Sequence, residues 1–264
     1  MRLATFNILH GRTFDGGPAS VDRLAEACAS LEADVLALQE VDRGQPRSGG
    51  VDQAAVVAEG MGAAAWRFEP AIVGEPGGRW RPASNEDHDA EVHPRADGGY
   101  GVALVSRLPV RAWHVLRLTA APMRSPVFVP GRRAFVLLQD EPRVVLGAEL
   151  EGARGPSIVA STHLSFVPGW NAWQLRRATR WLAGIGSPCV LLGDTNLPGP
   201  LPGWLSGSGW SDLARARTFP ADEPSMQIDH ALGRGALPDV VAVTATRLPL
   251  SDHRALVVDL APAE

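Results

Sequence analysis

The sequence predicts an α/β (α+β) fold in which stacked β-sheets are flanked by helices. Short apolar runs separated by turn residues recur along its 264 residues, while helical periodicity occurs in few places. No internal repeat or long low-complexity linker divides the chain. At roughly 150 residues per domain, this length fits one large domain or two small ones. We expect a single domain over residues 1–264, because no linker separates two halves.

The strands are predicted from the apolar runs. A short apolar run bounded by turn residues is typical of a buried strand. The predicted strands span residues 3–9, 35–41, 102–106, 134–138, 144–150, 157–164, 189–193, 228–232, 240–244 and 255–260.

Three segments show helical periodicity. The first follows Ser20, a plausible N-cap, and its apolar residues recur at helical spacing. These residues are Val21, Leu24, Cys28 and Leu31. The second, with a weaker pattern, covers residues 52–61, and the third covers residues 171–183. In the third, the inward face comprises Leu175, Ala178 and Leu182, and the outward face comprises Arg176, Arg177 and Arg180.

Residues 74–99 form a segment of different composition, rich in glycine, proline and charged residues. A structureless loop of this length is usually functional or disordered. His88 and His93 lie among acidic residues, so a metal site there is an alternative to a solvated loop.

Charge and composition exclude several kinds of site. The formal net charge is −4, which disfavours a protein that mainly holds a nucleic-acid backbone. The sequence contains no lysine, so all 25 basic residues are arginine. A Walker A lysine, a Schiff-base lysine and a Ser-Lys dyad are therefore excluded. Any phosphate must be held by arginine, histidine, backbone amides or a metal ion.

The cysteines and the start of the chain indicate a cytoplasmic protein. Cys28 and Cys189 lie in apolar segments, which predicts buried thiols and no disulfide framework or zinc site. The apolar runs are far shorter than the ~20 residues of a membrane span. A strand-like run begins at residue 3 and leaves no room for a signal peptide.

Polar side chains stand at the ends of several apolar runs, where they would be costly unless paired or bound to a metal. In α/β sheets, loops bring such strand-end groups together into sites. Carboxylate and amide oxygens suit Mg²⁺ or Mn²⁺, and histidine suits proton transfer and hydrogen bonding. The strand-end residues are Asn7, Glu40, His163, Asp194, Asn196, Asp252 and His253.

Taken in order, the blocks that hold these residues resemble the endonuclease/exonuclease/phosphatase superfamily of metal-dependent phosphoesterases. A single block is weakly specific, but the ordered set spans nearly the whole chain. The blocks are TFN at 5–7, LQEV at 38–41, GVALVSR at 101–107, STHL at 161–164, GDTN at 193–196, IDH at 228–230 and SDH at 251–253.

The resemblance implies a four-layer α/β/β/α sandwich of two mixed β-sheets flanked by helices. It also implies a metal site. Glu40 would be the main Mg²⁺ ligand, with Asn7 and Asp252 in or beside the metal shell. Mn²⁺ is an alternative ion for the same oxygen donors.

The same resemblance implies catalytic roles. Asp194 would orient or deprotonate the attacking water, and Asn196 and His163 would hydrogen-bond the phosphoryl oxygens. His253, oriented by Asp229, would stabilise the charged transition state. These roles agree with phosphoryl transfer, which needs positioned positive charge more than covalent help.

Substrate-binding residues are less firmly indicated by the sequence. Arg107 and Arg133 are candidates for a phosphate-binding arginine, with surface or strand-pairing arginines as the alternative. Trp170 and Trp173 follow His163, and Trp80 lies in the segment 74–99. A tryptophan near the cleft could stack on a base or contact a lipid or sugar, although packing within the fold is the alternative.

The family motifs that this sequence lacks reduce the number of activities that we expect. Thr162 and His163 match the histidine form of deoxyribonuclease-like and sphingomyelinase-like members, whereas the Tyr-x-Pro-Asn motif of apurinic-site endonucleases is absent. The segment 224–230 also lacks the Trp-Cys-Asp-Arg signature of inositol 5-phosphatases. We therefore expect a hydrolase of small-molecule or lipid-type phosphoesters, with a DNA or RNA nuclease as the first alternative. A catalytically silent binding module is a second alternative, and no protein partner is inferred.

The segment 74–99 adds to the expectation that nucleic acid is not the preferred substrate. It carries Glu75, Glu86, Asp87, Asp89, Glu91 and Asp97 against Arg79, Arg81 and Arg95. If this acidic segment covers the site, it should repel a long polyanion while a compact substrate passes.

Overall fold

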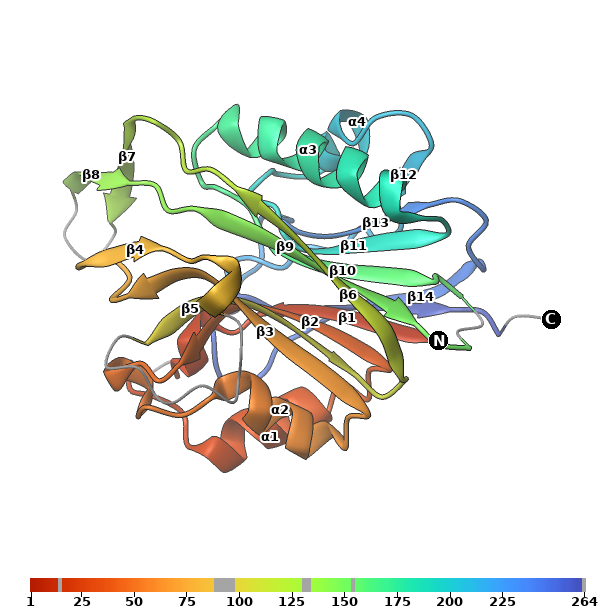
Figure 1. The fold of residues 1–264 in the computed structure, drawn as a ribbon, viewed down its shortest axis with the longest axis horizontal. Helices are drawn as coiled ribbons and strands as arrows, with labels where there is room; N and C mark the ends of the chain where they lie inside the picture. The colour runs from red at the N-terminus through yellow and green to blue at the C-terminus, as the bar shows by residue number, and fades with distance from the viewer. Residues whose placement is uncertain (14–15, 88–97, 130–133, 153–154, 263–264) are drawn as a thin grey trace.

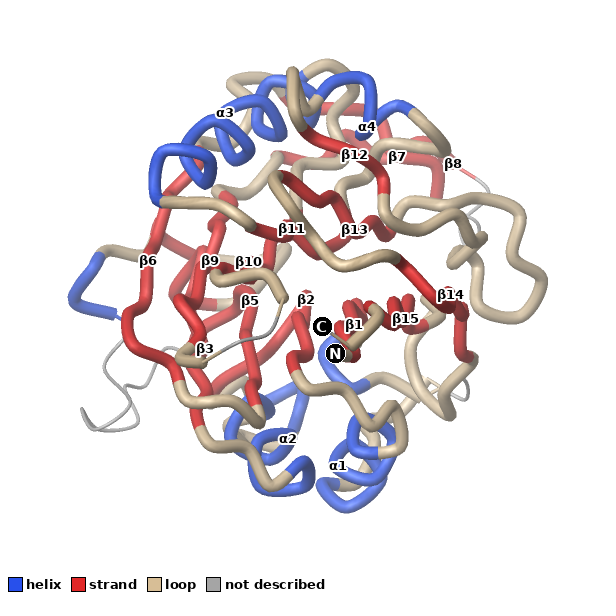
Figure 2. The backbone as a smooth tube through the Cα atoms, turned by 90° about the vertical axis from the view of Figure 1, so that its right-hand side faces the viewer, coloured by secondary structure: helices blue, strands red, loops and turns tan. Residues whose placement is uncertain are grey.

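The structure, a computed structural model, describes residues 1–13, 16–87, 98–129, 134–152 and 155–262. Two large mixed β-sheets lie face to face, with helices on the two outer faces (Figure 1). The predicted α/β/β/α sandwich is therefore confirmed. Figure 2 shows the same four layers from the side, with α1 and α2 below one sheet and α3 and α4 above the other.

The first sheet has seven strands. In spatial order they are β14 (Val240–Thr246), β15 (Ala255–Leu260), β1 (Arg2–Asn7), β2 (Val35–Arg43), β5 (Gly99–Ser106), β3 (Ala65–Gly74) and β4 (Trp80–Pro82). Helices α1 (Val21–Ala29) and α2 (Gln53–Met61) cover its outer face. The Ser20 side chain caps α1 by accepting a hydrogen bond from the Arg23 N–H, as the sequence predicts, and Asp52 caps α2 in the same way.

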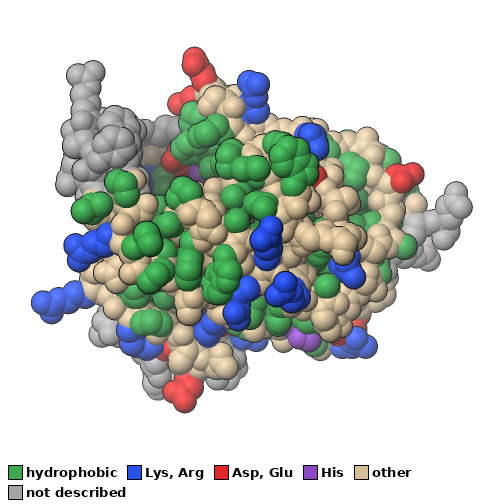
Figure 3. Space-filling model, turned by 90° about the horizontal axis from the view of Figure 1, so that it is seen from above, with side chains coloured by type: hydrophobic (Ala, Val, Ile, Leu, Met, Phe, Trp, Pro, Cys, Tyr) green, Lys and Arg blue, Asp and Glu red, His purple; other side chains and the backbone are tan. Residues whose placement is uncertain are grey.

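The second sheet has six strands. In spatial order they are β12 (Trp210–Asp212), β13 (Asp229–Arg234), β11 (Cys189–Asp194), β10 (Ile158–His163), β9 (Arg143–Leu150) and β6 (Val110–Leu118). Helices α3 (Trp170–Ile185) and α4 (Leu201–Leu205) cover its outer face, and β7 (Arg124–Val129) pairs with β8 (Ala134–Gln139) in a separate hairpin. The α3 arginines predicted to face outward are exposed, and basic side chains lie among hydrophobic ones on this side of the molecule (Figure 3).

Buried apolar side chains fill the space between the layers. One cluster lies between the two sheets and includes Leu3, Val102, Leu146 and Val190. Two further clusters pack the helices onto the sheets. Each fully buried leucine or valine contributes about 1.5–3 kcal/mol relative to an exposed one, so these layers hold the sheets in a fixed relation.

A chain of buried polar groups also joins the two sheets. The Gln39 amide accepts a hydrogen bond from Thr5 at 3.1 Å and donates one to the Ser161 hydroxyl at 3.2 Å. The Ser161 hydroxyl in turn donates to the Leu38 carbonyl at 3.2 Å. Because buried polar groups are costly when unpaired, these bonds fix the alignment of β1, β2 and β10 at their carboxyl ends.

Each predicted strand and helix is present, with boundaries that differ by a few residues. The strands that the prediction missed are β3, β4, β6, β7 and β12. β6 lies at a sheet edge and is mostly half-buried, so its arginine, histidine and tryptophan residues interrupt the apolar pattern. β4 and β12 are three residues long, which is too short for periodicity to reveal.

The prediction of one structureless loop over 74–99 was wrong for part of that segment. Residues 80–82 form β4, which pairs with β3, and Asn85–Asp87 form a 3₁₀ turn. Two hydrogen bonds from the Arg81 guanidinium to the Asp87 carboxylate, at 2.7 and 2.9 Å, hold these pieces together. Residues 88–97, including His88 and His93, lie outside the described residues.

The remaining general predictions concern the thiols and the membrane. Cys28 and Cys189 are buried free thiols, as predicted. Within the described ranges, no helix is long and apolar enough to cross a membrane. The cytoplasmic location stays a prediction.

Candidate active site

Two pairs of parallel strands bring the predicted site residues to one end of the sandwich. β1 lies parallel to β2, so Asn7 comes next to the end of the apolar part of β2. β10 lies parallel to β11, with His163 directly opposite Asp194. β13 runs antiparallel to β11 and places Asp229 opposite Asp194. The carboxyl ends of β1 and β2 in one sheet and of β10 and β11 in the other therefore meet at one polar cluster.

A bulge in β2 turns Glu40 toward this cluster. The pairing of β2 with β5 shifts register between Gln39 and Val41, and Glu40 adopts a positive φ of 55°. Non-glycine residues seldom adopt this conformation, and bulges commonly re-aim a side chain beside an active site. Leu9, His10, Asn196 and Ser251 also have positive φ angles and lie in the loops around the cluster. Such concentrated backbone strain is typical of functional sites.

Asp194 is the centre of the cluster. Its Oδ2 accepts a hydrogen bond from Asn7 Nδ2 at 3.1 Å and lies 3.6 Å from His163 Nε2 and 3.8 Å from His253 Nε2. Its Oδ1 accepts the backbone N–H of Asn196 at 2.9 Å. Burial, reinforced by the charge of Asp229, raises the pKa of Asp194 to about 7. A carboxyl group with this pKa can gain or lose a proton near neutral pH.

His253 forms a buried ion pair with Asp229. His253 Nδ1 donates a hydrogen bond to Asp229 Oδ2 at 2.9 Å. Burial alone would lower the pKa of His253, but the charge and hydrogen bond of Asp229 raise it to about 10. His253 is therefore cationic at neutral pH and presents its Nε2 proton toward Asp194. His163 differs, because burial and the charge of Arg143 hold its pKa well below the ordinary value.

Glu40 has few partners in its surroundings. Its Oε1 accepts a hydrogen bond from Asn7 Nδ2 at 3.1 Å, and its Oε2 lies 4.0 Å from His10 Nδ1. Burial raises the pKa of Glu40, while burial and the charge of Arg47 lower the pKa of His10 to about 4. Neutral His10 cannot balance the Glu40 charge, so a bound cation would stabilise this carboxylate.

The residues around Glu40 fit a hard divalent cation. Glu40 and Asp252 offer carboxylate oxygens, and the Asp252 side chain is 50% exposed and open to solvent. The amide oxygen of Asn7 accepts one hydrogen bond from the Leu9 N–H and retains a second lone pair. Such oxygen donors suit Mg²⁺ or Mn²⁺.

Asp194, Asp229 and His253 form another group with ligand atoms close enough to hold a metal, all within 4.8 Å of one another. His253 Nδ1 and Asp229 Oδ2 are already hydrogen-bonded to each other at 2.9 Å, which argues against this use. The Glu40 side of the cluster is therefore the better candidate for a cation.

Several predicted residues lie away from this chemistry or are engaged elsewhere. Arg107 follows β5 at the opposite end of the sheet, where its Nε donates to the Met61 carbonyl at 3.1 Å. Asn196 is in the cluster, but its Nδ2 donates to the Leu164 carbonyl at 3.0 Å. Trp170 Nε1 donates to the Thr119 carbonyl at 2.9 Å. Arg133 lies outside the described residues.

Arg143 is the arginine that the sequence prediction missed. It begins β9 beside the end of β10, so it lies at the same end of the sheet as His163. Its side chain is 6% exposed and reaches Asp140 only at 3.4 Å, and its Nε has no hydrogen-bond partner among the described residues. A polar residue at the end of an apolar run was the signal used for the other site residues, and Arg143 precedes the run 144–150.

Comparison with known families agrees with this geometry. The sequence model of the Endonuclease/Exonuclease/phosphatase family matches residues 4–253. The chain belongs to this family. The resemblance drawn from the sequence blocks is thus confirmed, and the protein is a metal-dependent phosphoesterase by family. A search among curated protein sequences found no match.

Solved structures show the same fold. The chain is similar to an endonuclease/exonuclease/phosphatase from Beutenbergia cavernae, with 24% identity over 100% of this chain and 72% of that one and a TM-score of 0.65. A mannosyl-6-phosphatase from Bacteroides thetaiotaomicron is 13% identical, with 99% of each chain covered and a TM-score of 0.58. The human Nocturnin catalytic domain is 18% identical over 99% of this chain and 94% of that one, with a TM-score of 0.59.

Proposed function

We propose that the protein hydrolyses small-molecule or lipid-type phosphoesters, with Asp194 acting on the attacking water. The observation that carries this proposal is the position of Asp194 between one neutral histidine and one cationic histidine, at 3.6 and 3.8 Å. A carboxylate with a pKa of about 7 can accept the proton of water. The neighbouring cationic His253 can stabilise the charge that develops on the phosphoryl oxygens.

The other residues position these groups. Asp229 holds His253 in its protonated form and fixes the ring through the 2.9 Å hydrogen bond. Asn7 donates to both Glu40 and Asp194, which couples the two carboxylates. His163 and the buried Arg143 offer further contacts for phosphoryl oxygens. Glu40, Asn7 and Asp252 would hold Mg²⁺ or Mn²⁺, which when bound supplies positive charge that polarises a phosphoryl oxygen.

The two alternatives differ in measurable ways. A nuclease would use the same cluster but needs a basic surface that tracks a nucleic-acid backbone. The net charge of −4 and the absence of lysine favour a compact substrate instead. A catalytically silent binding module would show no Mg²⁺-dependent turnover. The set of acids and histidines around Asp194 favours an enzyme.

Substitution of Glu40 tests the metal-dependent activity. Glu40→Gln keeps the shape of the side chain and removes its charge, so turnover of bis-p-nitrophenyl phosphate and p-nitrophenyl phosphate should nearly vanish. The melting temperature without metal should rise, because the uncompensated carboxylate is lost. Addition of Mg²⁺ should raise the melting temperature of the wild type but not that of Glu40→Gln.

Glu149 provides a matched control for this experiment. Its side chain is 19% exposed, as is that of Glu40, but it lies in β9 far from Arg143 and pairs with Arg111. Glu149→Gln should keep both the activity and the response to Mg²⁺. Normal turnover by Glu40→Gln, or by the wild type in excess chelator, would refute the metal assignment.

A further inference from the structure

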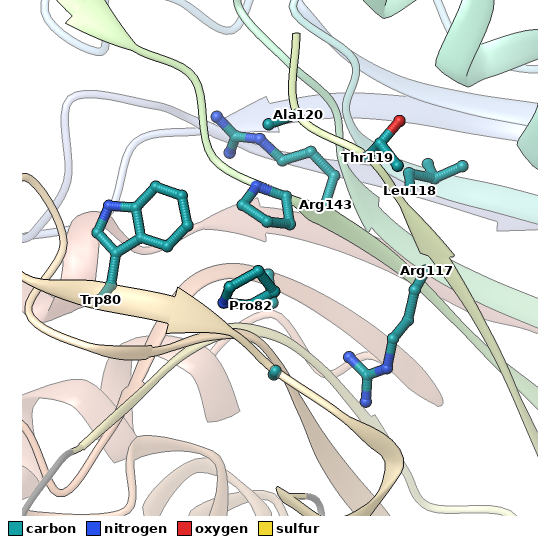
Figure 4. A pocket seen from close by; sticks show the side chains of 10 residues that line it. Trp80, Pro82, Arg117, Leu118, Thr119, Ala120 and Arg143 are labelled. Carbon is teal, nitrogen blue, oxygen red and sulfur yellow. The ribbon is translucent and has the colours of Figure 1, made fainter. Parts of the chain in front are cut away.

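A pocket opens between the two sheets beside the catalytic cluster. Its volume is about 320 Å³, which is at the small end of ligand pockets. Trp80 and Pro82 of β4 line one side, and Leu118 and Arg143 of β6 and β9 line the other (Figure 4). The two sides therefore belong to different sheets.

The walls of the pocket are mostly apolar and include a broad aromatic surface. Besides the indole ring of Trp80, the lining contains alanine and proline side chains. They are Ala71, Pro82, Ala83, Ala120 and Pro142. A planar ring gains dispersion energy on such surfaces, and stacking on an indole ring tolerates any flat π-system. A pocket of this volume has room for one ring system but not for a long acyl chain as well.

Two arginines line the pocket. The Arg117 guanidinium has several hydrogen-bond partners, whereas Arg143 has a donor without a partner among the described residues. The Arg117 guanidinium donates to the Ser84 carbonyl at 2.6 Å and to the Pro70 carbonyl at 2.9 Å. These bonds hold it against β3 and the residues that follow β4. Arg143 has a weak 3.4 Å contact with Asp140, and its buried Nε has no partner among the described residues. A buried donor of this kind is costly unless a ligand or water completes it.

Arg143 also connects the pocket to the catalytic cluster. Asp140, its partner, accepts a hydrogen bond from the Ser165 hydroxyl at 2.8 Å, two residues after His163. The charge of Arg143 contributes to the lowered pKa of His163 and acts on Glu40. Arg143 therefore lies in the wall of the pocket and also at the end of the sheet that holds His163.

We propose that this pocket holds the organic group of the phosphoester and selects substrates in which that group is a planar aromatic or heteroaromatic ring stacked on Trp80. Arg143 would lie at the junction, where it can donate to an oxygen that links ring and phosphorus. The inference rests on the proposed function for the position of the phosphoryl group. It goes further by naming the class of leaving group.

Phosphonates test the pocket without hydrolysis. Phenylphosphonate and methylphosphonate share the anionic group and differ in the ring, so calorimetric titration with Mg²⁺ present isolates the contribution of the ring. The wild type should bind phenylphosphonate more tightly. Trp80→Leu should weaken phenylphosphonate binding about tenfold, the scale of aromatic stacking, and leave methylphosphonate unchanged. Trp80→Phe should restore most of the preference because it restores a flat ring.

Trp204 supplies the matched control. It is 74% exposed on α4 and does not line the pocket. Trp204→Leu should bind both phosphonates as the wild type does. Equal affinities of the wild type for the two phosphonates, or equal weakening of both by Trp80→Leu, would overturn the proposal. Ring-selective binding without any Mg²⁺-dependent turnover would refute the proposed function and support the pocket.

Discussion

At the scale of single residues, the environment of the cluster raises the pKa values of both an acid and a neighbouring histidine. Burial and Asp229 raise the pKa of Asp194 to about 7, while Asp229 keeps His253 cationic with a pKa of about 10. Base catalysis requires a group whose pKa is near neutrality, and charge stabilisation requires a group that is cationic at neutral pH. Loss of either group should therefore affect chemistry more than stability.

Substitutions of these three residues should have unequal effects. Asp194→Asn and His253→Ala should each lower kcat by roughly 10²–10⁴, the range for catalytic proton transfer and charge stabilisation. Asp229→Asn should cost less, since it acts through His253. Steady-state kinetics on a small phosphoester, with melting temperatures measured in parallel, checks this order.

His114→Ala and Asp259→Asn are suitable controls for that series. His114 lies in β6 beside Glu149, and Asp259 pairs with Arg2 in β15, both outside the cluster. These variants should keep kcat. Equal and mild losses across all three cluster variants, accompanied by lower melting temperatures, would identify the cluster residues as structural.

The position of a polar side chain at the end of an apolar run predicted which residues lie together, while their catalytic roles stay predictions. Asn7, His163 and Asp194 follow this rule, and the structure brings them together. The rule did not reveal which arginine joins them. Arg107 and Arg143 both flank strands, and only the antiparallel directions of β5 and β9 determine which end of the sheet each one reaches.

At the scale of elements, an ion pair between Arg81 and Asp87 supports the short strand β4, which also pairs with β3. Asp87 accepts hydrogen bonds from Arg81 at 2.7 and 2.9 Å and from the Ser84 N–H at 2.8 Å. The Arg81 hydrogen bonds hold the pKa of Asp87 well below its ordinary value. β4 carries Trp80, so this ion pair supports a wall of the pocket. No apolar periodicity in the sequence signals such an element.

The stability supplied by Asp87 should depend on pH. A carboxyl group whose pKa is depressed by folding stabilises the protein above its ordinary value of 3.8 and loses this effect as pH falls toward the depressed pKa. Asp87→Asn should therefore have a lower melting temperature than the wild type at pH 7. The difference should shrink progressively below pH 4. Thermal unfolding across this range measures it.

Asp222 gives a comparison for the pH experiment. Its side chain is 67% exposed and pairs with the exposed Arg247. Asp222→Asn should change the melting temperature little at any pH, because exposed ion pairs contribute little stability. A difference between Asp87→Asn and the wild type that stays constant from pH 7 to pH 3 would contradict the linkage argument.

At the scale of the whole molecule, the site and the pocket are products of how the two sheets meet. Periodicity predicted strands in both sheets, and the family resemblance implied that they pack face to face. The pocket was not predictable in this way. Its walls come from residues 71, 80, 82, 83, 117–120, 142 and 143, which no local pattern joins, and β3, β4 and β6 were among the strands that periodicity missed.

The charge of the whole molecule predicts weak activity on nucleic acid. The chain has a net charge of −4 and no lysine, and two arginines near the cluster, Arg47 and the buried Arg143, face Asp42 and Asp140. A protein that neutralises few phosphates binds DNA weakly, and its affinity falls only gradually with salt. Plasmid cleavage should therefore be slow beside turnover of bis-p-nitrophenyl phosphate, and its rate should change little with salt concentration. Assays of both substrates over a salt series make the comparison. Rapid plasmid nicking whose rate falls steeply as salt increases would instead favour a nuclease, since a steep salt dependence requires many neutralised phosphates.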